Sequence, residues 1–265
     1  MRGWTFWAGV SFLVFLFFFA LFGPNFRFNF LDPVGRPFVP PGSEHWLGTD
    51  ELGRDILARL AYGGRISLLI GFTVQFLSLF VGTTVGILGV FAPKWISAPL
   101  LRLTDAMFAF PDILLAILIV GVAPRLGLVS VIVALSITAW PSMARLVKTQ
   151  METLKDREFV VAAKATGDST LSIIWRHILP QLWGILLAVS MVELAGTILA
   201  ESTLSYLGIG VQAPDPSWGS MINSAQPVMD GHPLYLLWPC LLLSATIFAL
   251  NFVGDGLRER LDPRR

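Results

Sequence analysis

Acidic side chains inside apolar stretches are the residues whose placement most suggests chemistry. Glu193 lies in the middle of the apolar stretch 182–200, and Glu201 follows its end. Only 14% of the 265 residues are charged and 54% are hydrophobic, whereas a soluble domain carries about 25% charge, so these glutamates lie in or beside lipid. A charge at the bilayer centre costs about 2.5–3.5 kcal/mol, so such groups normally face a pathway or a polar partner. Both glutamates are therefore candidates for a translocation pathway or for a contact between helices.

Other kinds of site lack the residues that they need. His45, His177 and His232 are far apart and show no metal-ligand spacing, and a single cysteine, Cys240, excludes an internal disulfide. Serine and histidine residues fall on opposite sides of the expected membrane, so they form no nucleophile–base set. The sequence contains no G-x-x-x-x-G-K-[ST] phosphate loop, and its net charge of +1 gives no argument for nucleic acid. We therefore predict no catalytic residue, no metal site and no cofactor bound by this chain.

A charged segment precedes the second apolar stretch. Asp50, Arg54 and Asp55 are spaced so that opposite charges can pair within the segment. Alternatively, the three residues form an outer lip that contacts a substrate or a substrate-carrying protein. Both interpretations place them outside the membrane.

Six stretches are long enough to form membrane-spanning helices, which need about 20 apolar residues each. They lie near residues 4–22, 67–91, 103–122, 127–147, 182–200 and 234–253. The sequence therefore predicts an all-α, polytopic membrane protein with six transmembrane helices. Arg2 before the first stretch would suit a cleaved signal peptide, but no Ala-x-Ala site follows, so an uncleaved anchor helix is favoured.

Proline and glycine residues predict details of these helices. Pro111 and Pro141 should each kink a helix, because proline lacks the N–H that the helix bonds require. Gly82 and Gly86 form a small-xxx-small face on the second helix, which lets another helix approach closely. Asp105, near the inner end of the third stretch, should pair with one of the basic residues that precede it.

Basic residues predict the orientation. With the amino terminus inside, the inner segments hold thirteen of the 19 lysine and arginine residues, and the outer segments hold six. Because cytoplasmic loops carry the excess of positive charge, both termini are predicted to be cytoplasmic. An even number of spans agrees with that.

The longest inner loop reads as two short helices. Residues 158–166 are good helix formers, Gly167 can end that helix in a left-handed conformation, and Asp168 or Ser169 can cap a second helix that Pro180 would terminate. Its apolar residues should find too little of this chain outside the membrane to pack on. They should bury against a soluble partner or lie on the lipid surface, and the sequence alone does not decide between these. They are Phe159, Val160, Leu171, Ile174 and Trp175.

This loop resembles the EAA loop of ATP-binding-cassette (ABC) importer permeases, whose pattern is Glu-Ala-Ala, a glycine four residues on, and Leu-Pro at the end. The matching residues are Ala162, Ala163, Gly167, Leu179 and Pro180. Val161 and His177 depart from the general pattern, as is common in the peptide-type branch. Segments 45–68, 201–219 and 251–264 are similar to C-type subunits of dipeptide, oligopeptide and nickel permeases.

The resemblance implies a type I ABC importer transmembrane domain over residues 65–255. An anchor helix and outer segment would precede it (1–64), and a cytoplasmic tail would follow it (256–265). It implies a bacterial inner-membrane permease that transports di- or oligopeptides by alternating access, with nickel or a nickel chelate as the alternative. The implied partners are a B-type second permease chain, two ATP-binding subunits that use ATP and Mg, an extracytoplasmic substrate-binding protein and membrane lipid, with no nucleic acid. The EAA-like loop would couple the permease to the ATPase.

Two other classes remain to be distinguished. An intramembrane enzyme would need convergent catalytic groups at one depth, and turnover without ATP that depends on Glu193 would indicate it. A passive channel or scaffold would conduct in liposomes that contain this chain alone.

Overall fold

The computed structural model describes residues 3–261. Regular structure in this part is helical, apart from isolated backbone bridges between Pro33 and Arg54 and between Thr49 and Asp55. Arg2 and residues 262–265, which entered the predictions of orientation and of the carboxyl-terminal segment, lie outside the described residues. In chain order the elements are α1 (Gly3–Phe22), η1 (Gly23–Asn25), α2 (Ile56–Phe91), α3 (Lys94–Met107), α4 (Asp112–Gly121), α5 (Leu128–Leu154), α6 (Glu158–Ala165), α7 (Thr170–Ile173), the π-helical η2 (Ile174–Ile178), α8 (Leu179–Tyr206), α9 (Trp218–Ala225), η3 (Gln226–Val228) and α10 (Pro233–Leu261).

Within residues 3–261, five helices are long and apolar enough to cross a membrane on their own. They are α1, α2, α5, the continuous run through α7 and α8, and α10. A sixth span exists only if α3 and α4 are counted together, and these two helices are bent by 93° at their junction. The all-α, polytopic prediction is confirmed, and the third predicted stretch is the one that is not a single helix.

Pro111 accounts for that break. We predicted a kink at this residue, whereas α3 ends at Met107 and α4 begins only at Asp112. Pro111 is in an extended conformation (φ −61°, ψ 126°), and proline also disfavours helical geometry at the residue before it. By contrast, α5 runs without interruption through Pro141.

The second helix begins earlier than its apolar stretch. Asp55 caps α2, because its side chain accepts a hydrogen bond from the Ala58 backbone N–H at 3.0 Å. The 36 residues of α2 span about 54 Å, well beyond the hydrocarbon core of about 30 Å. The end of the predicted outer segment, from Ile56 to residue 64, is thus the first part of α2.

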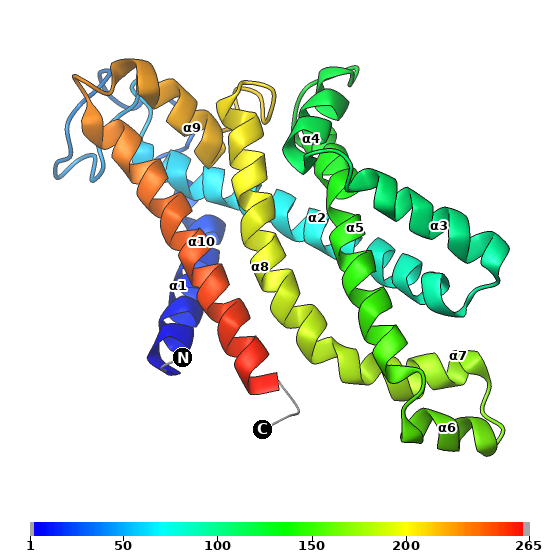
Figure 1. Cartoon of the computed structure of the whole chain (residues 1–265). Helices are drawn as coiled ribbons and strands as arrows, with labels where there is room; N and C mark the ends of the chain where they lie inside the picture. The colour runs from blue at the N-terminus through cyan, green and yellow to red at the C-terminus, as the bar shows by residue number, and fades with distance from the viewer. Residues whose placement is uncertain (1–2, 262–265) are drawn as a thin grey trace.

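The long helices pack around α2 and α8. α2 packs chiefly against α5 and α8, and α10 packs against α8 and α1. Figure 1 shows α9 and the 26–55 segment at one end of the bundle, and α6 and α7 at the other. The start of α1 and the end of α10 point toward the end that carries α6 and α7.

Gly82 and Gly86 bring α2 close to α5, as the small-xxx-small pattern predicts. A Cβ at Gly82 would lie 2.6 Å from the Met143 Cβ and 2.9 Å from the Ala144 backbone nitrogen. A Cβ at Gly86 would lie 2.7 Å from the Val147 side chain. Side chains at these positions would therefore force the two helices apart.

Gly82→Leu is expected to destabilise the folded chain, because overpacking typically costs about 1–3 kcal/mol. In detergent its melting temperature should fall by several degrees. Gly121→Leu is the matched control, since a Cβ at Gly121 meets nothing within 4 Å. Equal melting temperatures for the two variants would contradict the close α2–α5 contact.

Candidate functional site

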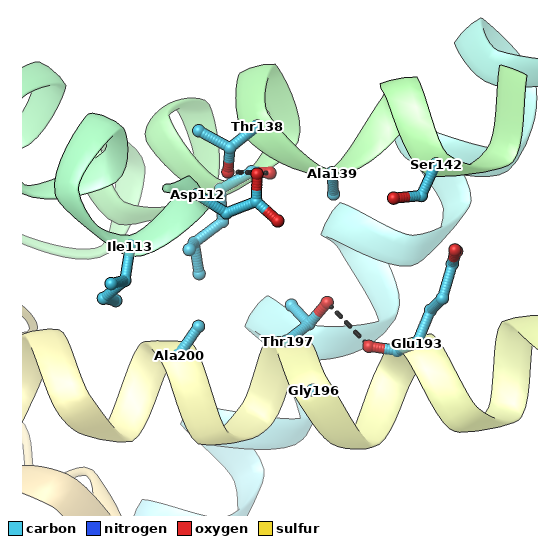
Figure 2. Close-up of a pocket in the computed structure, with 10 residues that line it drawn as sticks. Asp112, Ile113, Thr138, Ala139, Ser142, Glu193, Gly196, Thr197 and Ala200 are labelled. Atoms are coloured by element: carbon cyan, nitrogen blue, oxygen red, sulfur yellow. Dashed lines mark hydrogen bonds between the residues drawn. The ribbon is translucent and has the colours of Figure 1, made fainter. Parts of the chain in front are cut away.

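A cavity of about 290 Å³ lies between α4, α5 and α8 (Figure 2). Asp112 and Glu193 are the ionisable residues among the ten that line it, and they come from different helices. Three hydroxyl side chains, of Thr138, Ser142 and Thr197, add polar surface. The remaining lining residues are small or aliphatic: Ile113, Leu135, Ala139, Gly196 and Ala200.

Glu193 is positioned by the contact between α8 and α2. Gln75 of α2 donates its Nε2–H to the Glu193 Oε2 at 3.4 Å, and Gln75 itself is only 6% exposed. Thr197, one turn further along α8, donates to the Glu193 backbone carbonyl at 3.0 Å. The carboxyl group of Glu193 therefore contacts a neighbouring helix and also lines the cavity.

Asp112 was missed by the sequence analysis. It is the first residue of α4, directly after the break at Pro111, and its side chain lies over the cavity (Figure 2). Two sequence signals could have found it: an acidic residue follows a proline, and an apolar run begins immediately afterwards. The break turns that residue toward α5 and α8.

The inner loop has the turn that was predicted. α6 ends at Ala165, and Gly167 has a left-handed φ of +92°. Ser169 caps α7, because its Oγ accepts from the Ser172 backbone N–H at 3.3 Å. His177, one of the departures from the EAA pattern, pairs at 3.3 Å with Asp168, the residue directly after Gly167.

Pro180 does not end the second helix, so that prediction is wrong. The chain passes from α7 through η2 into α8 as one helical run from Thr170 to Tyr206. Pro180 is the second residue of α8 and therefore lies inside this run, where a proline needs a local change of helical geometry. η2 widens the turn just before it into a π-helical form.

The apolar residues of the loop divide into two sets, which corrects the expectation that the chain leaves them nothing to pack on. Val160 and Ile174 are buried and Phe159 is partly buried, and all three pack in the cluster that includes Met151 of α5. A second set is exposed: Val161 (55%), Leu171 (65%) and Trp175 (59%). The loop is therefore anchored on the chain's own core and presents a separate apolar surface, which we call the loop surface.

Comparison with known families decides what this arrangement belongs to. Residues 78–265, which include the cavity and the loop, match the family described as the binding-protein-dependent transport system inner membrane component. The chain belongs to this family. It is accordingly the membrane-spanning permease subunit of an ABC importer, and in such importers the ATPase is a separate subunit.

Individual relatives agree with this assignment. The dipeptide transport system permease protein DppC of Bacillus subtilis (strain 168) is 38% identical over 97% of this chain and 81% of its own length. The oligopeptide transport system permease protein OppC of the same strain is 37% identical over 97% of this chain and 85% of its own. The glutathione transport system permease protein GsiD of Pectobacterium atrosepticum is 38% identical over 84% of this chain and 74% of its own length.

Solved structures support the fold. A chain of the MetNI methionine ABC transporter has a TM-score of 0.64 at 19% identity, covering 78% of this permease and 96% of that chain. A chain of an amino acid ABC transporter solved with histidines has a TM-score of 0.59 at 15% identity, covering 79% of this permease and 94% of that chain. The permease therefore has the transmembrane fold of type I ABC importers, and it is a multi-pass inner-membrane protein.

Glu201 contacts helices and does not line the cavity. It is 0% exposed, and its two carboxyl oxygens accept hydrogen bonds from Ser67 of α2 and from Ser205, each at 2.8 Å. Ser202 adds a longer bond of 3.4 Å. Of the two roles considered for Glu201, the geometry matches the contact between helices.

Asp50, Arg54 and Asp55 are buried in the outer segment. Arg54 Nε donates to Asp50 Oδ2 at 2.7 Å, as expected for pairing within the segment, and Arg59 of α2 lies 3.2 Å from the same oxygen. Asp55 pairs with His45 at 3.0 Å. The three side chains are between 0% and 11% exposed, so they bind the segment to the start of α2 and offer almost no free surface.

Asp105 has a different partner from the one expected. It lies 3.3 Å from Arg145 of α5, and the basic residues that precede it, Lys94 and Arg102, are not the partners. The bend after α3 explains this, because it places the end of α3 beside α5. Arg145 also lies 3.5 Å from the centroid of the Phe108 ring.

Proposed function

We propose that this permease forms part of the pathway through which di- and oligopeptides enter the cell. The carrying observation is the similarity, over 97% of the chain, to permeases named for dipeptide and oligopeptide transport. The cavity between α4, α5 and α8 is the proposed segment of that pathway, and Glu193 is its proposed acidic residue. Alternating access would open this cavity first toward the outside and then toward the cytoplasm.

We further propose that the inner loop couples the permease to an ATPase. Ala162, Ala163, Gly167, Leu179 and Pro180 match the EAA pattern. Gly167 would fix the fold of the loop because it makes the turn, and Leu179 would do so because it is buried in the core. The loop surface would then enter a groove on the ATP-binding subunit.

The orientation proposal puts both termini in the cytoplasm. It is supported by the excess of basic residues in the inner segments, and by the position of α6 and α7 at the end of the bundle toward which α1 begins and α10 ends (Figure 1). The proposed domain boundaries, 65–255 for the transporter domain with 1–64 before it and 256–265 after it, are kept. α2 begins at Ile56, so the first boundary falls within that helix.

The proposed assembly pairs this permease with a B-type permease chain, in preference to a homodimer. Two ATP-binding subunits would use ATP and Mg, and an extracytoplasmic binding protein would deliver the cargo. Because Asp50, Arg54 and Asp55 are buried, we propose that they hold the shape of the outer lip. Exposed neighbours such as Trp46 and Leu52 would then make its contacts.

The substrate proposal is tested by uptake in proteoliposomes that contain the permease, its partner subunits and the binding protein. ATP-dependent uptake of a labelled dipeptide is expected, and a hydrolysis-deficient ATP-binding subunit is the control. Uptake of nickel ions but not of any di- or oligopeptide would overturn the proposal and favour the nickel alternative. Mass spectrometry of ligand that co-purifies with the binding protein gives an independent readout.

A further inference from the structure

We propose that Asp112 and Glu193 form an acidic pair that receives the positively charged amino terminus of a peptide in the cavity. This inference rests on the proposed peptide transport, and it adds which chemical group of the cargo the permease recognises. It assigns to Asp112 a role that the sequence patterns did not suggest.

The first step is the charge of the lining. The cavity wall contains two carboxyl groups and no lysine, arginine or histidine. Figure 2 shows Asp112 and Glu193 in the space between α5 and α8, with Thr138, Ser142 and Thr197 around them. A ligand there meets only negative or neutral acceptors, so a cation is favoured and an anion is not.

The second step is the support behind Glu193. Gln75 is 94% buried and reaches the Glu193 carboxyl group from α2. Its amide N–H holds one carboxyl oxygen, while its own Oε1 has no hydrogen-bond partner in the described part of the chain. An unpaired buried acceptor is costly, and here it belongs to the side chain that holds the Glu193 carboxyl group. Gln75, which does not itself line the cavity, therefore fixes Glu193 from the α2 side.

The third step is the choice among cations. A primary ammonium group has three N–H donors, which suits several oxygen acceptors spread over different helices. Divalent metals instead need a compact set of ligands, and residues 3–261 contain no group of three or more histidine, cysteine, aspartate or glutamate side chains that could hold one. The cavity of about 290 Å³ has room for an amino-terminal residue. The geometry thus fits the amino terminus of a peptide better than a metal ion.

The test uses the assembled complex without its binding protein, so that only the membrane part can discriminate. Binding of a dipeptide and of its N-acetylated form is measured by calorimetry at up to millimolar ligand. The wild-type complex should prefer the free amino group by about tenfold or more, since hydrogen bonds to charged groups are worth about 1.5–3 kcal/mol. D112N and E193Q together keep the shapes and remove both charges, and should reduce the preference to about twofold. Asp105→Asn is the matched control, an acidic residue outside the cavity, and should keep the wild-type preference.

Each outcome bears on the pair separately from the peptide function. If the wild-type complex takes up dipeptides in the proteoliposome assay but binds both forms equally or not at all, the acidic pair is wrong and peptide transport stands. A preference that survives the double substitution also rejects the pair. Displacement of the dipeptide by micromolar nickel would assign the carboxyl groups to a metal. If no peptide is taken up at all, the proposed function itself fails.

Discussion

Leu171→Asp combined with Trp175→Asp is expected to abolish ATP-driven uptake while leaving the permease folded. Both side chains are more than half exposed, so an aspartate costs little in the free chain. In a docked complex it would bury an unpaired charge and remove an apolar anchor, and interface tryptophans often contribute about 2 kcal/mol or more. Retention of the ATP-binding subunit during purification should fall by at least about tenfold, and stimulated ATP hydrolysis should fall with it.

Two neighbouring substitutions make the result interpretable. Thr170→Asp adds the same charge at the exposed first residue of α7, where a negative charge favours the helix, and it should retain the ATPase. Val160→Asp places the charge in the buried cluster and should unfold the loop, unlike a charge at the exposed Val161. If the double variant retains the ATPase at the wild-type level, the loop surface lies on lipid or elsewhere, and the coupling assignment is wrong.

The structure of the inner loop was predictable from the sequence only where local signals determine it. Helix formers, a glycine and a capping serine are local signals, and they correctly predict α6, the turn at Gly167 and the start of α7. Whether Val160 or Val161 faces the core depends on the position of α5 and α8, which no local pattern contains. Pro180 was misread for a similar reason, because a proline can end a helix or lie inside one whose geometry adjusts locally, as the π-helical η2 does here.

The membrane helices were likewise predicted where a local pattern determines them and missed where it does not. Runs of about 20 apolar residues locate α1, α5, α8 and α10 well, because the bilayer sets a minimum length. The sequence predicted a kink at Pro111 but not the complete break of the helix there, and the apolar stretch did not locate the start of α2 at Ile56. Both features depend on single residues that redirect the backbone.

The candidate site was predicted in part. Glu193 could be identified because a carboxyl group in an apolar stretch is conspicuous by itself. Asp112 was missed, although the proline before it and the apolar run after it are local signals, because its place in the cavity depends on the break between α3 and α4. Gln75 could not be identified, because it is an ordinary polar residue until α8 packs against α2. A site built from three helices requires the tertiary arrangement, and the sequence supplies only its most unusual member.

Glu201→Leu is expected to lower the stability of the permease markedly. Glu201 is the shared acceptor for Ser67 of α2 and Ser205 of α8, and Ser205 in turn accepts the Val211 backbone N–H at 3.1 Å. Leucine would leave these buried hydroxyl groups without their acceptor, at roughly 1–3 kcal/mol for each group. Thermal unfolding in detergent should occur several degrees lower, and protection of the 207–217 backbone against hydrogen exchange should fall.

Glu201→Gln and Glu193→Leu separate stability from transport. Glutamine keeps one oxygen acceptor, so Glu201→Gln should recover part of the lost stability. Glu193 has a single, longer side-chain bond to Gln75 and faces the cavity, so Glu193→Leu should change peptide uptake more than the melting temperature. If Glu201→Leu instead leaves the melting temperature unchanged and stops uptake, Glu201 acts in the pathway, and its burial among serines serves the transport cycle rather than the packing of α2 on α8.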